Sequence, residues 1–165
     1  MKILITGVDG FLGKKLLSFL SQRHEAFGIS RKKIRENVFL LDISEKEKLE
    51  NIITKIKPSV IVHAASLVDI ERCEEDRGIA YKMNVGCTEN IISICKKYAI
   101  RLVYISTDYV FSGKEKAYTI QSKKDPLNYY GETKSMAEEM IQSKLFDFAI
   151  MRPTILYGFN DFQDK

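Results

Sequence analysis

The chain has 165 residues, of which 45% are hydrophobic and 29% are charged, and its formal net charge at pH 7 is +4. These values are close to those of ordinary soluble domains, and they exclude a disordered chain, a collagen and a disulfide scaffold. A domain of this length buries roughly 70% of the surface of its unfolded chain, so it needs no cross-links to form a core.

The cysteines and histidines form no pattern that predicts a disulfide framework or a metal site. Cys87 and Cys95 lie in one predicted helix, too far apart along its axis to be bridged. There is no Cys-x-x-Cys motif, and His24 and His63 are the only histidines, so we predict no metal site. No apolar stretch reaches the length of a membrane span, and the N-terminus lacks a signal-peptide layout. We therefore expect a cytoplasmic protein that binds no membrane.

Short apolar runs alternate with amphipathic segments along the whole chain. In chain order we predict a strand over Lys2–Thr6, a helix over Phe11–Gln22, strands over Glu25–Ser30 and Val38–Leu41, a helix over Ser44–Lys57 with Ser44 as its N-cap, a strand over Ser59–His63, a helix over Ile79–Tyr98, a strand over Arg101–Ser106, a surface loop over Ser112–Asp125, a helix over Tyr129–Lys144 and a strand over Phe148–Met151. This alternation is typical of a parallel sheet covered by helices on both faces. We predict one doubly wound α/β domain of the Rossmann type over residues 1–165.

Three glycines, Gly7, Gly10 and Gly13, follow the first predicted strand at every third position, where a helix begins. In dinucleotide-binding folds, one such glycine permits the tight turn, another lets the backbone approach a pyrophosphate, and the third allows close packing of helix on strand. The helix N-terminus supplies N–H groups to the phosphates. Chance produces this spacing only rarely directly after a strand. We predict that these glycines, with Phe11 and Leu12, bind a dinucleotide coenzyme.

The end of the second predicted strand indicates which coenzyme is expected. Folds of this kind hold the ribose 2′-hydroxyl of NAD with an acidic residue at this point, whereas an arginine accommodates the 2′-phosphate of NADP. This chain has Ser30 and Arg31 there, which favours NADP(H), with NAD(H) as the alternative. A loop of solvated charges without a binding role is the other possibility at this position. The basic residues of Arg31–Arg35 have no interleaved aromatic residues, so we expect no nucleic-acid partner. Beyond the third strand, Asp42, followed by Ile43, either accepts from the adenine amino group or caps the next helix.

Tyr130 and Lys134 are four residues apart in a predicted helix, so they lie on one face about one turn apart. A free tyrosine has a pKa near 10, and a nearby ammonium group lowers that pKa toward the range useful for proton transfer. Ligands of parallel sheets bind beyond the carboxyl ends of the strands, where Thr107 follows the fifth strand. The fourth strand ends in His63 and then Ala64-Ala65-Ser66. We expect His63 to be packed rather than catalytic, and the small residues after it to leave room for a nucleotide ring.

Several motifs together resemble a known family. They are TGVDGFLG (6–13), LDI (41–43), HAAS (63–66), VDIERCE (68–74), MNVGCTEN (83–90), STDYVFSG (106–113), PLNYYGETK (126–134) and RPTILYG (152–158). In this order, the chain resembles the extended short-chain dehydrogenase/reductases, and within them the dTDP-4-dehydrorhamnose reductases. Related sugar-nucleotide dehydratases usually carry Asp-Glu after the threonine, where this chain has Asp108 and Tyr109.

The resemblance implies a role for each matched residue. Thr107 polarises the carbonyl of the substrate, Tyr130 donates the proton, and Lys134 tunes Tyr130 and binds the nicotinamide ribose. Arg152 and Pro153 lie near the nicotinamide. The implied reaction is NADPH-dependent reduction at C4 of a 4-keto-6-deoxy nucleotide sugar, as in dTDP-rhamnose biosynthesis.

The resemblance also bears on assembly and completeness. Members of the family often pair through two long helices, which implies a homodimer through Ile79–Tyr98 and Tyr129–Lys144. Such enzymes continue well beyond the RPTILYG motif, and their later residues supply most of the sugar-binding lobe. We therefore expect residues 1–165 to be a coenzyme domain without that lobe, and coenzyme binding to be better supported than turnover.

Two other functions stay open at this point. A related nucleotide-sugar epimerase would recycle its coenzyme and release no oxidised product. The regulatory β subunit of methionine adenosyltransferase resembles the same family, keeps the nucleotide-binding fold and acts as a binding partner. Because that subunit retains similar residues, the presence of Thr107, Tyr130 and Lys134 does not exclude it.

Overall fold

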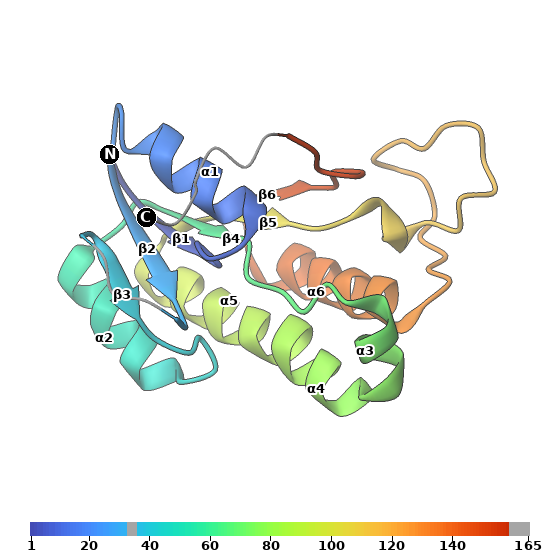
Figure 1. Ribbon diagram of the computed structural model, residues 1–165, viewed down its shortest axis with the longest axis horizontal. Coiled ribbons are helices and arrows are strands. Elements are labelled where there is room, and N and C mark those ends of the chain that lie inside the picture. The colour runs from blue at the N-terminus through green and yellow to red at the C-terminus, as the bar shows by residue number, and fades with distance from the viewer. Residues whose placement is uncertain (33–35, 159–165) are drawn as a thin grey trace.

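The computed structural model describes residues 1–32 and 36–158, and within them a single parallel sheet organises the chain (Figure 1). Its strands have the order β3-β2-β1-β4-β5-β6. They are β1 (Lys2–Thr6), β2 (Glu25–Ser30), β3 (Val38–Leu40), β4 (Val60–His63), β5 (Arg101–Ile105) and β6 (Phe148–Met151). Each neighbouring pair is parallel. The predicted doubly wound α/β fold is confirmed.

Helices cover both faces of this sheet (Figure 1). The longer ones are α1 (Phe11–Leu20), α2 (Lys46–Ile56), α5 (Cys87–Tyr98) and α6 (Tyr129–Lys144), and the shorter ones are α3 (Ile70–Glu75) and α4 (Arg77–Tyr81). Helix α1 lies on one face, while α2, α5 and α6 lie on the other. Among the residues that the structure describes, no helix combines the length and the apolar character needed to cross a bilayer.

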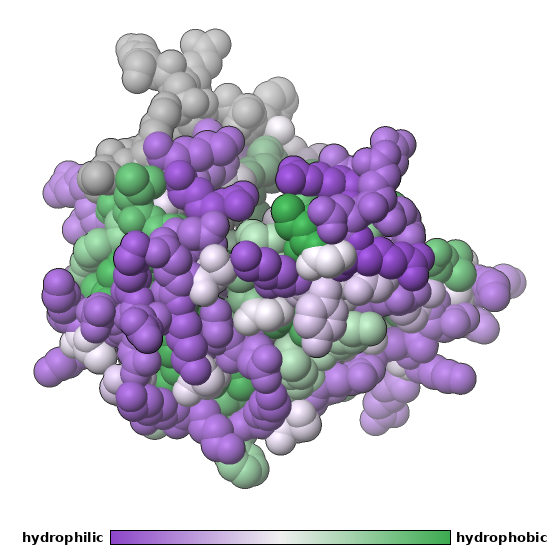
Figure 2. Space-filling model, turned by 90° about the horizontal axis from the view of Figure 1, so that it is seen from below, coloured by the Kyte–Doolittle hydropathy of each residue, from purple (hydrophilic) through white to green (hydrophobic). Residues whose placement is uncertain are grey.

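Alternation of side chains along the central strand builds a core on each face of the sheet. Leu4 packs into the larger core, which α2, α5 and α6 close. Its neighbours Ile3 and Ile5 point to the opposite face and join the smaller core under α1. Successive side chains of a strand point to opposite faces, so a continuous apolar run serves both cores. Figure 2 shows that the outward face seen from below is mostly hydrophilic.

The helix predicted over Ile79–Tyr98 is interrupted. It consists of α4, a π-helical turn (Lys82–Gly86) and α5. The wider turn buries Asn84, whose amide donates to the Leu67 carbonyl (3.0 Å) and the Thr133 hydroxyl (3.0 Å). Turns of this type frequently occur at functional sites. Here the turn anchors the segment that follows β4 to helix α6.

The start of α2 also differs from the prediction. Glu45, not Ser44, is the N-cap, and its side chain makes no capping hydrogen bond. The Ser44 N–H donates to the Asp42 carboxylate at 2.9 Å, so the turn before the helix is held by Asp42. Ser44 stands at a position from which it could cap α2, but Asp42, two residues earlier, holds this turn instead.

Candidate functional site

The carboxyl ends of β1, β2, β4 and β5 open into one crevice of about 770 Å³, which we call the main crevice. Its volume is typical of a small-molecule site, and its place is where doubly wound sheets bind ligands. The predicted site residues in its walls are Gly7, Gly10, Phe11, Leu12, Gly13, Arg31, Ile43, Ala64, Ala65, Ser66, Thr107, Tyr130, Lys134 and Pro153. Ser30 and Asp42 are not among the residues that line it.

The glycine turn between β1 and α1 has little room for any side chain. Gly7 adopts a left-handed conformation (φ 76°), and a Cβ there would lie 2.7 Å from the Ala65 nitrogen. A Cβ on Gly13 would overlap the Gly7 carbonyl oxygen and lie 2.9 Å from the Val8 Cα. Gly10 is the N-cap of α1, where no side chain caps the helix and no acidic residue occupies the first turn. This uncapped, positive helix end forms one wall of the main crevice and suits a phosphate.

Asp9, which was not predicted as a site residue, lies in the glycine turn and lines the main crevice. Its carboxylate accepts the Ser30 hydroxyl at 2.8 and 2.9 Å and the Arg31 backbone N–H at 3.2 Å. Ser30, predicted as a coenzyme ligand, is therefore engaged by Asp9. The contact follows from parallel pairing of Thr6 with Ile29, which brings the ends of both strands together. Arg31 is exposed and lines the crevice; residues 33–35 of the same basic loop lie outside the described residues.

Asp42 and His63 have structural partners. The hydrogen bond from the Ser44 backbone lowers the pKa of Asp42, which keeps the carboxylate ionised in its turn. His63 is buried between the hydroxyls of Thr6 (2.7 Å) and Thr88 (3.1 Å), and burial lowers its pKa to about 3. A neutral imidazole with a partner on each ring nitrogen is packed rather than catalytic, as we expected.

The start of α6 places Tyr130 in the main crevice. The Asn128 side chain caps the helix by accepting the Gly131 N–H at 2.8 Å. A Cβ on Gly131 would overlap the Tyr109 carbonyl, so only glycine lets the helix approach the segment after β5 this closely. The rings of Tyr109 and Tyr130 meet edge to face with centroids 6.0 Å apart. Tyr109 was not predicted; it lines the crevice two residues after Thr107.

The acid–base pair differs electrostatically from the prediction. Burial raises the pKa of Tyr130 to about 12, although the nearby Thr107 hydroxyl opposes this rise. The Lys134 ammonium group donates to the Ile105 carbonyl at 2.7 Å and lies 4.3 Å from the Tyr104 ring centroid. Burial lowers the pKa of Lys134 to about 7. The predicted lowering of the Tyr130 pKa by Lys134 is wrong, because desolvation of the phenol dominates.

Arg152 does not line the main crevice, although the residue after it does. Pro153 lines the main crevice, but the Arg152 guanidinium donates to both oxygens of Glu138 at 2.9 and 2.7 Å. Glu138 was not predicted as a site residue. It lies one helical turn after Lys134 on α6, a spacing that could have drawn attention to it.

Comparison with known proteins identifies relatives over nearly the whole chain. A sequence model for the family described as the RmlD substrate binding domain matches residues 1–163. The β subunit of methionine adenosyltransferase 2 from Rattus norvegicus is 31% identical over 158 residues, covering 95% of this chain and 47% of that protein. The dTDP-4-keto-6-deoxy-D-glucose reductase of Streptomyces niveus is 30% identical over 157 residues, covering 94% and 52%. The chain therefore spans about half the length of these relatives.

Solved structures show the same relation. A hypothetical dTDP-4-dehydrorhamnose reductase from Sulfolobus tokodaii superposes with a TM-score of 0.86 at 35% identity, covering 93% of this chain and 56% of that one. The dTDP-4-dehydrorhamnose reductase of Bacillus anthracis, solved with NADP, has a TM-score of 0.86 at 30% identity and coverages of 94% and 54%. A UDP-glucose 4-epimerase from Brucella ovis, solved with NAD, has a TM-score of 0.83 at 19% identity, covering 92% and 51%; at that identity it speaks for the fold alone.

Proposed function

The chain belongs to the RmlD substrate-binding-domain family, and from this premise we propose that it binds NADP(H) and serves the reduction of a 4-keto-6-deoxy nucleotide sugar. The resemblance inferred from the motifs is thereby confirmed at the level of the family. The observation that carries the proposal is that the glycine turn and the triplet Thr107, Tyr130 and Lys134 line the same crevice. A phosphate-binding turn and a proton donor that share one cavity are what a reductase requires.

The residues present fit a dinucleotide. The uncapped start of α1 beside Gly7 and Gly10 suits the pyrophosphate, and Ala64–Ser66 leaves space for a flat ring. Arg31 and Lys32, exposed at the end of β2, would hold a 2′-phosphate. With Ser30 engaged by Asp9, the preference for NADP(H) over NAD(H) rests on these two cations.

The coenzyme would supply the hydride, and the chain's own residues would handle the carbonyl oxygen and the proton. Because burial raises the pKa of Tyr130 to about 12, its phenol is protonated at neutral pH and holds a proton to give. The Thr107 hydroxyl, which lines the same crevice, would donate to the same carbonyl oxygen. The Lys134 cation would offset the negative charge left on the phenolate.

A second candidate function is that of a binding subunit. It is favoured by the 31% identity with the methionine adenosyltransferase 2 β subunit over 95% of this chain. In that role the coenzyme would be bound without turnover. The predicted homodimer through α5 and α6 stays a prediction for either function.

The test is a fluorescence titration of the chain with NADPH and with NADH, followed by an assay of NADPH oxidation with a 4-keto-6-deoxy nucleotide sugar. The proposal expects binding tighter for NADPH, and a Tyr130→Phe variant that binds normally but does not turn over. If neither coenzyme binds below millimolar concentration, the proposal is wrong. The subunit role would be supported if NADPH binds without being oxidised and a synthetase co-purifies with the chain. That co-purification should be unchanged in Tyr130→Phe.

A further inference from the structure

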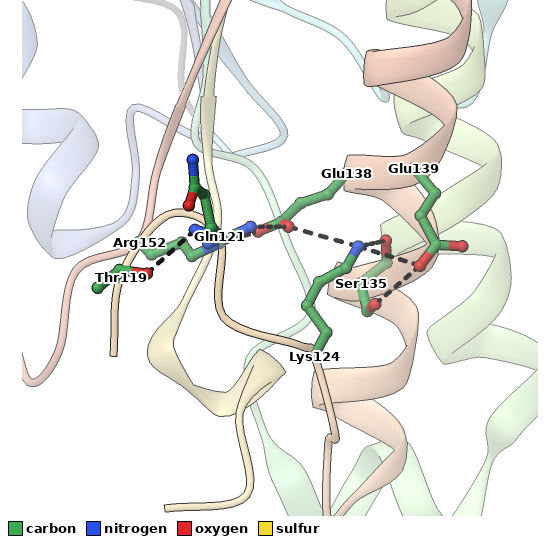
Figure 3. Close-up of polar contacts among 7 residues, drawn as sticks. All are labelled: Thr119, Gln121, Lys124, Ser135, Glu138, Glu139 and Arg152. Carbon is green, nitrogen blue, oxygen red and sulfur yellow. Dashed lines mark hydrogen bonds and ion pairs between the residues drawn. The ribbon is translucent and has the colours of Figure 1, made fainter. Parts of the chain in front are cut away.

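Helix α6 carries a fully buried carboxylate, Glu138, one turn beyond Lys134. The Arg152 guanidinium holds it with two hydrogen bonds of 2.9 and 2.7 Å, and the Lys124 ammonium lies 3.6 Å from the same carboxylate (Figure 3). Burial opposes ionisation of Glu138, but the bonds from Arg152 and the charge of Lys124 outweigh it, so the pKa is lowered. Removing a partner of a buried carboxylate is destabilising, because it leaves a charge without compensation.

The two cations come from segments far apart in the sequence. Lys124 belongs to the long loop between β5 and α6 and also donates to the Ser135 carbonyl at 3.2 Å. Arg152 directly follows β6, and its guanidinium lies 5.1 Å from the centroid of the Phe111 ring. Phe111 in turn stacks on Tyr118 with centroids 4.3 Å apart. Glu138 therefore holds both ends of the loop and the segment after β6 against α6.

Those segments form the walls of a second cavity of about 710 Å³, here called the outer cavity. Phe111, Tyr118 and Arg152 line it. The outer cavity adjoins the main crevice, because Asp108, Tyr109 and Thr154 line both. The loop and the segment after β6 therefore border the same space as Tyr109, whose ring contacts Tyr130.

We infer that Glu138 is a positioning residue, whose buried carboxylate ties the walls of the outer cavity to the helix that carries Tyr130 and Lys134. It lines neither the main crevice nor the outer cavity itself, and it acts through Lys124 and Arg152. The link from Glu138 to these walls rests on the contacts alone; only its consequence for the reduction at Tyr130 rests on the proposed function.

The same carboxylate also acts on Lys134 through space. The titratable groups around Lys134 are Tyr130 and Glu138 on α6, Tyr104 on β5 and His63 on β4. Burial lowers the pKa of Lys134, and the negative charge of Glu138 opposes that change. Neutralising Glu138 therefore lowers the Lys134 pKa further, an effect that a purely mechanical brace would not have.

The experiment compares Glu138→Gln with Glu139→Gln in the full chain. Both glutamates lie on α6 near Lys124, but Glu139 is 65% exposed and pairs with Lys124 at 3.0 Å from the surface. The readouts are amide hydrogen exchange in residues 112–125 and the pKa of Lys134 by NMR of labelled lysine side chains. We expect Glu138→Gln to speed exchange of the loop by about tenfold or more and to lower the Lys134 pKa. Glu139→Gln is expected to change neither, because exposed ion pairs contribute little.

A second variant covers the case in which Glu138→Gln does not fold. Lys124→Met removes one cation and leaves the Glu138–Arg152 pair, so it is expected to speed exchange in 112–125 while α6 exchanges as in the wild type. Wild-type loop exchange in Lys124→Met, or equal effects of Glu138→Gln and Glu139→Gln, would overturn the inference. Neither readout uses a coenzyme, so failure of NADPH to bind would refute the proposed function and not this link.

Discussion

Replacing Gly13 by alanine tests the glycine turn directly. The added Cβ would overlap the Gly7 carbonyl oxygen and would lie 2.8 Å from the Gly7 carbonyl carbon and 2.9 Å from the Val8 Cα. All three atoms are backbone atoms of the turn itself, so no side chain can rotate away to relieve the contact. Either α1 moves away from β1 or the turn is distorted, and both changes alter the wall of the main crevice.

The size of the effect follows from two opposing contributions. Overpacking of this kind costs about 1–3 kcal/mol, and a clash with backbone belongs at the upper end of that range. Alanine in a helix is favoured over glycine by about 1 kcal/mol. The net destabilisation is then about 2 kcal/mol, which for a chain of this size lowers Tm by roughly 4–8 °C.

Gly86 provides the matched control, since a Cβ there meets nothing within 4 Å and its backbone is helical (φ −62°, ψ −43°). Gly86→Ala should therefore raise the free energy of unfolding by up to about 1 kcal/mol. Urea denaturation and NADPH titration of both variants are the assays. The reasoning fails if Gly13→Ala is as stable as the wild type. If Gly13→Ala is destabilised but binds NADPH normally, the coenzyme does not bind at this turn.

Three further predictions concern single side chains. Arg31→Ala should weaken NADPH about tenfold in a fluorescence titration and leave NADH unchanged; equal loss of both would contradict the 2′-phosphate contact. The pKa of His63 is about 3 in the folded state against 6.5 ordinarily, so the unfolded chain binds more protons between those values and stability falls as pH falls through them. His63→Gln should show a smaller loss in urea denaturation between about pH 7 and pH 4. The pKa of Lys134 is about 7 against 10.5, so wild-type stability rises with pH in that window; Lys134→Met should abolish the rise, and an unchanged slope would refute it.

The strands could be predicted from sequence because each is a short apolar run bounded by polar residues or turn residues. All six fall within one residue of the predicted bounds. The π-helical turn at Lys82–Gly86 could not be predicted, since Asn84 owes its inward position to bonds with Leu67 and Thr133. Ser44 was misassigned for a related reason. The sequence left open whether Asp42 caps this helix or binds adenine, and only the contact of its carboxylate with the Ser44 N–H shows that it holds the turn.

Most of the site residues could be predicted from the topology of the sheet. The rule that parallel strands present their carboxyl ends to one edge places Gly7, Ala64 and Thr107 together, although they are distant in sequence. The contacts of Asp9 with Ser30 and of Arg152 with Glu138 could not be predicted, because tertiary structure brings these partners together. A charged residue in a sequence motif indicates that an oppositely charged or hydrogen-bonding partner is needed, but the sequence does not say which residue that partner is.

The reversed electrostatics of the Tyr130 and Lys134 pair are consistent with the proposed reduction. Burial favours the neutral form of both groups, so the phenol keeps its proton until a stronger base appears beside it. As a carbonyl oxygen gains negative charge during reduction, it becomes that base, and the proton of Tyr130 moves only then. Lys134, with a pKa of about 7, is close to the point where a new negative charge on the phenol decides its protonation. In such a pair, Tyr130 gives up its proton only when negative charge develops on the substrate, and it stays protonated when no substrate is bound. An exposed tyrosine with an unperturbed pKa would hold its proton less firmly.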